Sequence, residues 1–179
     1  ARMFVHETNL ADCDHMAIAE VVDALSYHKI DMVRLVAAKS PYALPKTLRR
    51  LSEENSFAMN SRLCRNHRTP LDVLEKFVNS DDVNFRRLVA TSPHVTPAML
   101  EKLSDDEQWI VKKRVGANKV TPPDVLQAMA EREFAIVKDV NNENTHYSVA
   151  VLYVVEANGN TPKDVRDEIV HYFYGDREY

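Results

Sequence analysis

The chain has 179 residues, of which 45% are hydrophobic and 28% are charged, so it can bury one core without disulfides. Its formal net charge of −4 excludes a bulk attraction for nucleic acid or for an anionic membrane. Three glycines exclude a glycine-rich phosphate loop, and two cysteines exclude a four-thiolate metal site. The longest apolar run, residues 149–155, is too short to span a membrane, and the two cysteines fit a reducing compartment, so we expect a cytoplasmic protein.

A motif, Asn-x-x-Thr-Pro, recurs along the chain, first intact at Asn66. The first residues of this motif and of its looser copies, here called anchors, are Ser40, Asn66, Ser92, Asn118 and Asn158. The first four anchors are 26 residues apart, and Asn144 continues this spacing, so we predict a fifth anchor there. A fixed period of this length indicates a repeat protein.

Apolar and small residues keep the same register. The eighth residue after each of the first four anchors is leucine: Leu48, Leu74, Leu100 and Leu126. The second residue before each is small, which predicts close helix contact: Ala38, Cys64, Ala90 and Gly116. We therefore interpret Cys64 as a core residue and not as a metal ligand. The group Asp12-Cys13-Asp14-His15 also lacks paired ligand spacing, so no metal site is expected.

Each repeat is predicted to contain two helices, A and B. Thr of the motif is predicted as the N-cap of helix A and Pro as its first residue. The anchor Asn is predicted to end helix B in the left-handed conformation. Acidic residues between the two helices are expected to cap helix B. By this pattern Glu131 and Glu133 should precede a helix B that contains Val137.

Two short helices cannot bury a leucine face alone, so neighbouring repeats are expected to stack. We predict an all-α fold, an α-solenoid of about five 26-residue two-helix repeats in a single domain covering residues 1–179. Residues 1–29 form the predicted N-terminal cap, residues 30–145 the regular repeats and residues 146–179 a modified C-terminal cap. In that cap, 147–157 is predicted to form one apolar helix, and the last helix is predicted from Thr161.

Residues 85–93 and 96–103 resemble leucine-rich repeat variant units, whose pattern is approximately Val-Arg-x-x-Val-Ala-x-Asn-Pro-x-Thr-Pro-x-x-x-Leu-x-x-Leu. The resemblance covers residues 30–145, with a weaker copy at 149–170, although the period here is longer than that of the family. It implies a right-handed superhelix in which the second helix is short and often 3-10. The N-terminal cysteine cluster of the family's iron–sulphur member is absent here, and the resemblance brings no catalytic residue.

The sequence favours a non-catalytic scaffold that binds a macromolecule. No serine or cysteine lies in an activating motif, and we expect no catalytic residue, cofactor or small-molecule substrate. A closed pocket with an adjacent nucleophile and base would instead indicate a small hydrolase. With a net charge of −4, a protein partner is favoured over nucleic acid. The alternative is a HEAT-like α-solenoid that contacts a phosphate backbone, and no membrane partner is expected.

Two groups of residues are candidate binding surfaces. The first is a ladder of basic residues in predicted helix B, interrupted at Asn60: Arg34, Arg62, Arg86, Arg87, Lys112, Lys113 and Lys138, with Arg65 and Arg114 beside it. Stacked repeats would align these basic residues, although the residues could equally solubilise helix B and pair with the acidic turns.

The second group lies in the C-terminal aromatic end: Tyr147, Tyr153 and Tyr172. Tyrosine is favoured at interfaces, but these rings could also fill the cap. Trp109 is predicted as a wedge between repeats.

Overall fold

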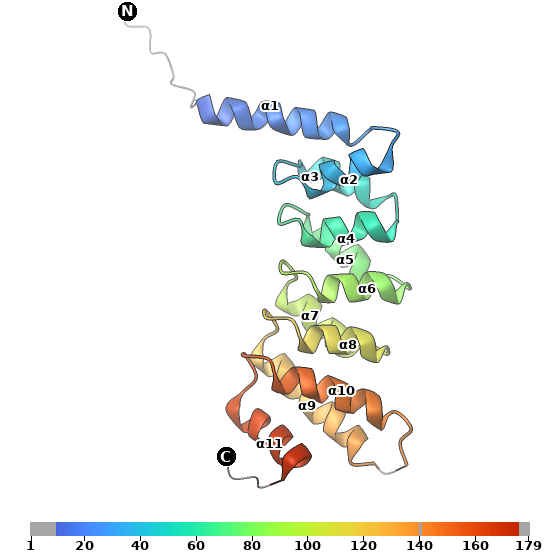
Figure 1. The fold of residues 1–179 in the computed structure, drawn as a ribbon, viewed down its shortest axis with the longest axis vertical. Coiled ribbons are helices and arrows are strands. Elements are labelled where there is room, and N and C mark those ends of the chain that lie inside the picture. Colours follow the sequence, from blue (N-terminus) through green and yellow to red (C-terminus); the bar gives the residue numbers. More distant parts are fainter. Residues whose placement is uncertain (1–9, 140, 176–179) are drawn as a thin grey trace, which may run out of the picture. The chain divides into compact units, whose positions relative to one another are not determined.

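A computed structural model describes residues 10–139 and 141–175, with side chains from residue 14 onward (Figure 1). Every regular element in these residues is an α-helix, and they contain no strand, which confirms the all-α prediction. The chain divides into two compact units, the first ending at Val73 and the second beginning at Leu74. The grouping of the whole chain into one domain stays a prediction. None of the described helices has both the length and the apolar character needed to cross a bilayer.

The described helices alternate between A helices and B helices. The A helices are α1 (Leu10–Leu25), α3 (Pro45–Ser52), α5 (Leu71–Val78), α7 (Pro97–Ser104), α9 (Pro123–Val137) and α11 (Lys163–Tyr174). The B helices are α2 (Asp31–Lys39), α4 (Phe57–Arg65), α6 (Val83–Ala90), α8 (Trp109–Gly116) and α10 (Thr145–Glu156). From α2 to α8 the B helices have only eight or nine residues, as expected. They are α-helices, which is one of the two forms, α or 3-10, that were expected for the second helix.

In the first unit, α2 packs against α1, α3 and α4, and α3 packs against α4. Leu48 and Leu51 of α3 and Met59 and Leu63 of α4 are at most 1% exposed and form the core. Removing such side chains from water is the main favourable contribution to folding. The first unit therefore consists of successive helical hairpins that share one interior.

The second unit repeats this arrangement. The B helices α6, α8 and α10 contact one another in succession, and the A helix α9 contacts α7 on one side and α11 on the other (Figure 1). The four register leucines, three of which lie in this unit, are at most 1% exposed: Leu48, Leu74, Leu100 and Leu126. Their predicted burial is confirmed. Within each unit the helix contacts are those of a packed helical repeat.

The predicted anchor at Asn144 is wrong. Helix α9 continues through Glu131, Glu133 and Val137, and α10 begins at Thr145. The stretch from residue 128 to 137 contains no Gly, Pro, Ser, Thr or Asn, so nothing interrupts the helix there. Asn118 and Asn158 are consecutive anchors, separated by one A helix and one B helix that are both longer than any helix from α2 to α8. The apolar helix predicted at 147–157 is confirmed as α10.

The anchor asparagines do not adopt the predicted left-handed conformation. Asn66 has φ −87° and ψ 118°, and Asn55 is the non-glycine residue with positive φ in the described chain. Instead, Asn66 Nδ2 donates hydrogen bonds to the carbonyl oxygens of Ala38 and Ser40, at 2.7 and 3.0 Å. Asn118 Nδ2 donates equivalent bonds to Ala90 and Ser92, at 2.8 and 3.0 Å. The anchor therefore satisfies carbonyls at the end of the preceding B helix that the helix itself leaves unpaired.

The motif threonine also differs from its predicted role. Helices α5, α9 and α11 begin one residue after Pro70, Pro122 and Pro162, so the proline and not the threonine precedes the helix. The threonine hydroxyl donates a hydrogen bond to a carbonyl six residues earlier, from Thr69 to Leu63 at 2.7 Å and from Thr121 to Val115 at 2.6 Å. These bonds close the loop between B and A helices. Only Thr96 of the described motif threonines is the N-cap, and its hydroxyl accepts from Met99 N.

The small residue before each of the first four anchors is buried, and at Gly116 it lies where two helices approach closely, as predicted. At Gly116 a Cβ atom would lie 2.9 Å from Val154 Cγ2 and 3.2 Å from Val155 Cγ2 of α10. Ala38 and Ala90 are completely buried, and Cys64 is 2% exposed. The register thus limits side-chain volume at this point of every B helix from α2 to α8.

Candidate interaction surface

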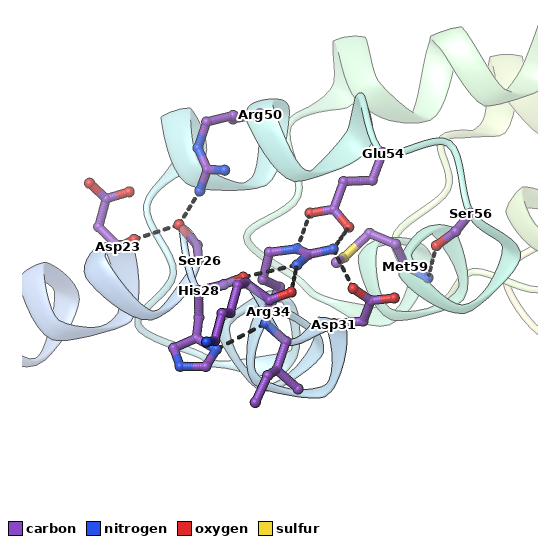
Figure 2. A network of polar contacts seen from close by, with 11 residues as sticks. Asp23, Ser26, His28, Asp31, Arg34, Arg50, Glu54, Ser56 and Met59 are labelled. Atoms are coloured by element: carbon purple, nitrogen blue, oxygen red, sulfur yellow. Dashed lines mark hydrogen bonds and ion pairs between the residues drawn. The ribbon is translucent and has the colours of Figure 1, made fainter.

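The ladder residues nearest to the core are fixed by ion pairs within the chain. In the first unit the Arg34 guanidinium donates to both carboxylate oxygens of Glu54, at 2.7 and 3.0 Å. Its remaining nitrogen donates to the carbonyl oxygens of His28 and Lys29 (Figure 2). These contacts raise the pKa of Arg34, chiefly through the hydrogen bonds with Glu54. Arg34 therefore joins the loop before α2 to the loop after α3.

Arg86 in the second unit makes the same set of contacts two repeats later. Its guanidinium donates to the Asp106 carboxylate at 2.6 and 3.1 Å and to the carbonyls of Ser80 and Asp81 at 2.9 and 3.0 Å. Both side chains of the pair are largely covered, at 12% exposure for Arg86 and 6% for Asp106. A paired fork of this kind suits arginine and not lysine. Arg34 and Arg86 thus perform one repeated structural task.

Lys112 and Lys138 are also paired. Lys112 Nζ lies 2.6 Å from Glu133 Oε1, and Glu133 is only 2% exposed, although it was predicted to cap a helix. Lys138 Nζ lies 3.6 Å from Glu168 Oε1 and 4.9 Å from the centre of the Phe134 ring. Lys138 follows α9, an A helix, so its predicted place on a B helix is wrong. The positive charges of Arg34, Arg86, Lys112 and Lys138 are therefore matched within the chain.

A second set of cations lies on the outer side of the B helices, where four are exposed and two, Arg87 and Lys113, are half-buried. We call them the outer cations: Lys39, Arg62 and Arg65 in the first unit, and Arg87, Lys113 and Arg114 in the second. None of the six forms an ion pair in the described part of the chain. Arg87 donates to Asn84 Oδ1 at 3.1 Å, and Lys113 Nζ lies 5.7 Å from the Trp109 ring centre. Of these, Arg62, Arg87 and Lys113 were in the predicted ladder.

Lys39 was not predicted, because the ladder was built from the position six residues before each anchor and from basic residues beside it, and in the first repeat only Arg34 was taken. The outer cations lie one, four or five residues before an anchor, which are the positions of the outward side of helix B. A further signal was present in the composition. Helices α4, α6 and α8 contain seven Lys or Arg residues and no Asp or Glu.

Exposed apolar side chains accompany the outer cations of the first unit. Met32 and Val36 of α2 are 69% and 61% exposed, and Phe57 of α4 is 51% exposed. Met32, Val36 and Lys39 follow one another at spacings of four and three residues, so they share one side of α2. The outward side of these two helices is therefore both basic and apolar.

The C-terminal aromatic residues pack mainly against one another. Tyr153 stacks on Phe173 with 4.7 Å between ring centres, and Tyr172 meets the Phe134 ring edge-on at 5.6 Å. Both tyrosines are still more than 40% exposed. Tyr147 stacks on Trp109 of the preceding B helix at 5.0 Å, which fits the predicted role of Trp109 between repeats. These rings join α10 to α8 and α11, and leave the outer edges of Tyr153 and Tyr172 open.

The described side chains contain no group of three or more His, Cys, Asp or Glu residues that could hold a metal ion. Burial raises the pKa of the Cys64 thiol to about 12, so this cysteine is suited to packing and not to nucleophilic attack. The side chains of Asp12 and Cys13 lie outside the described residues. A hollow of about 640 Å³ lies between α7 and α9 and is lined by residues of both charges, among them Glu101, Asp124 and Arg132.

Comparisons with protein-family models, with curated proteins and with solved structures give no match to this chain.

Proposed function

We propose that the chain is a non-catalytic helical-repeat scaffold that binds an acidic segment of another protein through the outward sides of its B helices. The observation that carries this proposal is the set of six outer cations, which have no carboxylate partner in the described residues although acids outnumber bases in the whole chain. Equivalent surface positions on successive repeats are the usual binding site of such proteins. In this proposal the stacked hairpins form a right-handed α-solenoid, as the resemblance to leucine-rich repeat variant units implies.

A protein partner fits this surface better than a nucleic acid does. A phosphate backbone offers nothing apolar to cover Met32, Val36 and Phe57, whereas an acidic peptide with apolar side chains matches both kinds of residue. The net charge of −4 would also weaken the approach of a long polyanion. A short acidic segment contacts only the outer cations near it, so the net charge of the whole chain opposes its binding less.

The direct test measures fluorescence anisotropy with three labelled probes: a peptide of glutamate with interspersed leucine, an all-glutamate peptide and a DNA duplex, each of about 20 units. We expect the glutamate–leucine peptide to bind most tightly and its affinity to fall only shallowly with salt. Phosphate-backbone binding would instead lower log affinity by about 0.9 per neutralised phosphate for each unit of log salt. Tighter binding of the duplex would overturn the proposal in favour of the nucleic-acid alternative.

Charge reversal of outer cations supplies the variant arm of this test. Replacing Arg62, Arg87 and Lys113 by glutamate should reduce peptide affinity at least tenfold while leaving helical content and Tm close to those of the parent. Lys163→Glu, at the start of α11, is the matched control and should leave affinity unchanged. An affinity in the triple variant equal to that of the parent would exclude the outer cations as the site.

A further inference from the structure

A hollow of about 410 Å³ opens between the C-terminal ends of α2 and α4. It is lined by Lys39, Arg62, Arg65 and Asn66. The two helices pack side by side in the first unit, so both walls of the hollow belong to the same compact unit (Figure 1). Asn66 is held in place by its two bonds to the carbonyls of Ala38 and Ser40. Three cations and one hydrogen-bonded asparagine therefore line the recess.

The charge of this hollow differs from that of the hollows in the second unit. The hollow between α7 and α9 contains Lys102 and Arg132 but also Glu101, Asp105 and Asp124. The hollow beside Trp109 contains Lys112 together with Glu107. No carboxylate lines the hollow of Lys39, Arg62 and Arg65, and none of these three side chains forms an ion pair in the described residues. Its positive charge is left for a ligand to neutralise.

Cations at a helix C-terminus have an explanation that needs no ligand, because they interact favourably with the helix dipole by about 0.3–1 kcal/mol each. Lys39 and Arg65 are the last residues of their helices, so this applies to both. Three like charges around one recess nevertheless repel each other, which opposes that gain. Helix capping and ligand binding make opposite predictions for replacing one of these cations by a neutral residue. If the cations only cap the helices, the substitution lowers stability. If they bind a ligand, it lowers ligand affinity and does not lower stability.

A phosphate monoester matches this recess better than a carboxylate does. Near neutral pH it carries between one and a half and two negative charges and three acceptor oxygens, whereas a carboxylate carries one charge. Arginine binds such a group through two parallel N–H donors, and lysine adds a point charge. Met32 and Val36 lie further along the same side of α2 and could contact apolar residues that flank the modified side chain.

We propose that the hollow bounded by Lys39, Arg62, Arg65 and Asn66 is a binding site for a phosphorylated serine or threonine in the protein segment that the scaffold binds. This rests on the proposed function, because it identifies one residue of the acidic segment. The site recognises the phosphate of a peptide, and a nucleic-acid backbone is the outcome that the test must exclude.

The first experiment titrates the protein with O-phosphoserine and follows the arginine Nε–Hε signals by NMR. We expect shifts of a small subset of these signals and a dissociation constant in the millimolar range. Binding should weaken at least threefold from pH 7.5 to pH 5, because the second pKa of the phosphate is about 6. In the double variant Arg62→Gln/Arg65→Gln the affinity should fall at least tenfold, with Tm equal to or above that of the parent. Lys163→Gln, at the start of α11 and outside the outer cations, is the matched control and should bind like the parent.

The second experiment compares peptides of glutamate and leucine that contain either serine or phosphoserine at the centre. We expect the parent protein to bind the phosphopeptide at least tenfold more tightly than the serine peptide. The double variant should bind the two peptides with equal affinity.

If O-phosphoserine binds the double variant as well as the parent, or if the double variant loses stability with no loss of affinity, the cations only cap the helices and the proposal is overturned. A DNA duplex that displaces the phosphopeptide at lower concentration would overturn it as well. Failure of the serine peptide alone, with the phosphopeptide still bound, would contradict the general acidic-segment function and leave this site intact.

Discussion

Asn158 Nδ2 donates a hydrogen bond of 2.9 Å to the carbonyl oxygen of Asn118, although the two residues are 40 positions apart. A second bond of 2.7 Å runs from the same nitrogen to Gly116 O. These are the contacts that Asn118 itself makes with Ser92 and Ala90 one repeat earlier. Hydrogen bonding, and not spacing in the sequence, therefore identifies which residues are successive anchors.

Replacing Asn118 by alanine should destabilise the protein by about 2 kcal/mol. Two hydrogen bonds are lost, and the carbonyls of Ala90 and Ser92 are left without their donor in a partly buried place. Urea unfolding followed by circular dichroism measures the change in the free energy of unfolding.

Asn144→Ala is the matched control, because this asparagine has the 26-residue spacing but precedes α10 without a side-chain capping bond. Its effect should stay within about 0.5 kcal/mol. Equal losses in the two variants would show that the anchor bonds contribute nothing to stability.

Arg86→Ala should cost about 3 kcal/mol, because it leaves the covered Asp106 carboxylate without its partner and two backbone carbonyls without a donor. The neighbouring Arg87 faces outward, and Arg87→Ala should change stability by less than about 0.5 kcal/mol. Thermal and urea unfolding of the two variants check the contrast. Arg86→Lys should recover only a minor part of the loss, since a lysine cannot reproduce the four-bond fork. Full recovery by lysine would mean that charge alone matters at this position.

Gly116→Ala should destabilise the protein by about 1 kcal/mol. The added methyl group would overlap Val154 and press on Val155, both of which are β-branched and unable to move aside easily, and this outweighs the better helix propensity of alanine. Gly159→Ala is the comparison, since a Cβ there meets nothing within 4 Å and the backbone is not left-handed. It should be neutral or slightly stabilising. Unfolding curves in which both substitutions behave alike would contradict the close approach of α8 and α10.

Cys64 should make stability depend on pH in the alkaline range. Burial raises the pKa of its thiol from 9.0 to about 12, so above pH 9 the unfolded chain releases this proton while the folded chain keeps it. Stability that is fully present below pH 9 is then lost as pH rises toward 12, by at most about 1.4 kcal/mol per pH unit. Cys64→Ala removes this dependence and keeps the small side chain found at Ala38 and Ala90. We expect the stability of the parent to fall by about 1 kcal/mol more than that of the variant between pH 8 and pH 10, in urea unfolding at each pH. Parallel pH profiles would rule out a thiol that stays protonated in the core.

The regular part of the fold could be predicted from the sequence because periodic burial leaves a periodic trace. The register leucines and the small residues before the anchors recur in the sequence because the same positions are buried in successive repeats. The longer repeat could not be predicted from spacing, because the capping pattern around Glu131 and Glu133 looks the same whether the chain turns or continues as a helix. The signal that decides is the absence of a helix breaker between residues 128 and 137, and the buried pair of Lys112 and Glu133 then joins the continued helix to α8.

The candidate surface was predictable only in part. The sequence shows that helix B is rich in Lys and Arg, but not which cations are used inside the molecule. Arg86 and Arg87 are adjacent in sequence, yet one is fixed by Asp106 and the other faces outward. That distinction depends on an acid from the following repeat, and no local pattern encodes it. The same holds for Lys39, whose neighbours Arg62 and Arg65 come from a different helix.

The anchor asparagines give the array a direction. Each side-chain amide donates to carbonyls of the repeat before it. A repeat near the C-terminus is therefore bonded to its predecessor, and removing that repeat breaks none of the asparagine hydrogen bonds between earlier repeats. Opening of the second unit should accordingly spread from α11 toward α6, with amide protons exchanging sooner in α11 than in α8. A chain shortened at its C-terminal end, one repeat at a time, would keep the remaining links, whereas a cut from the other side would strip the next asparagine of its acceptors.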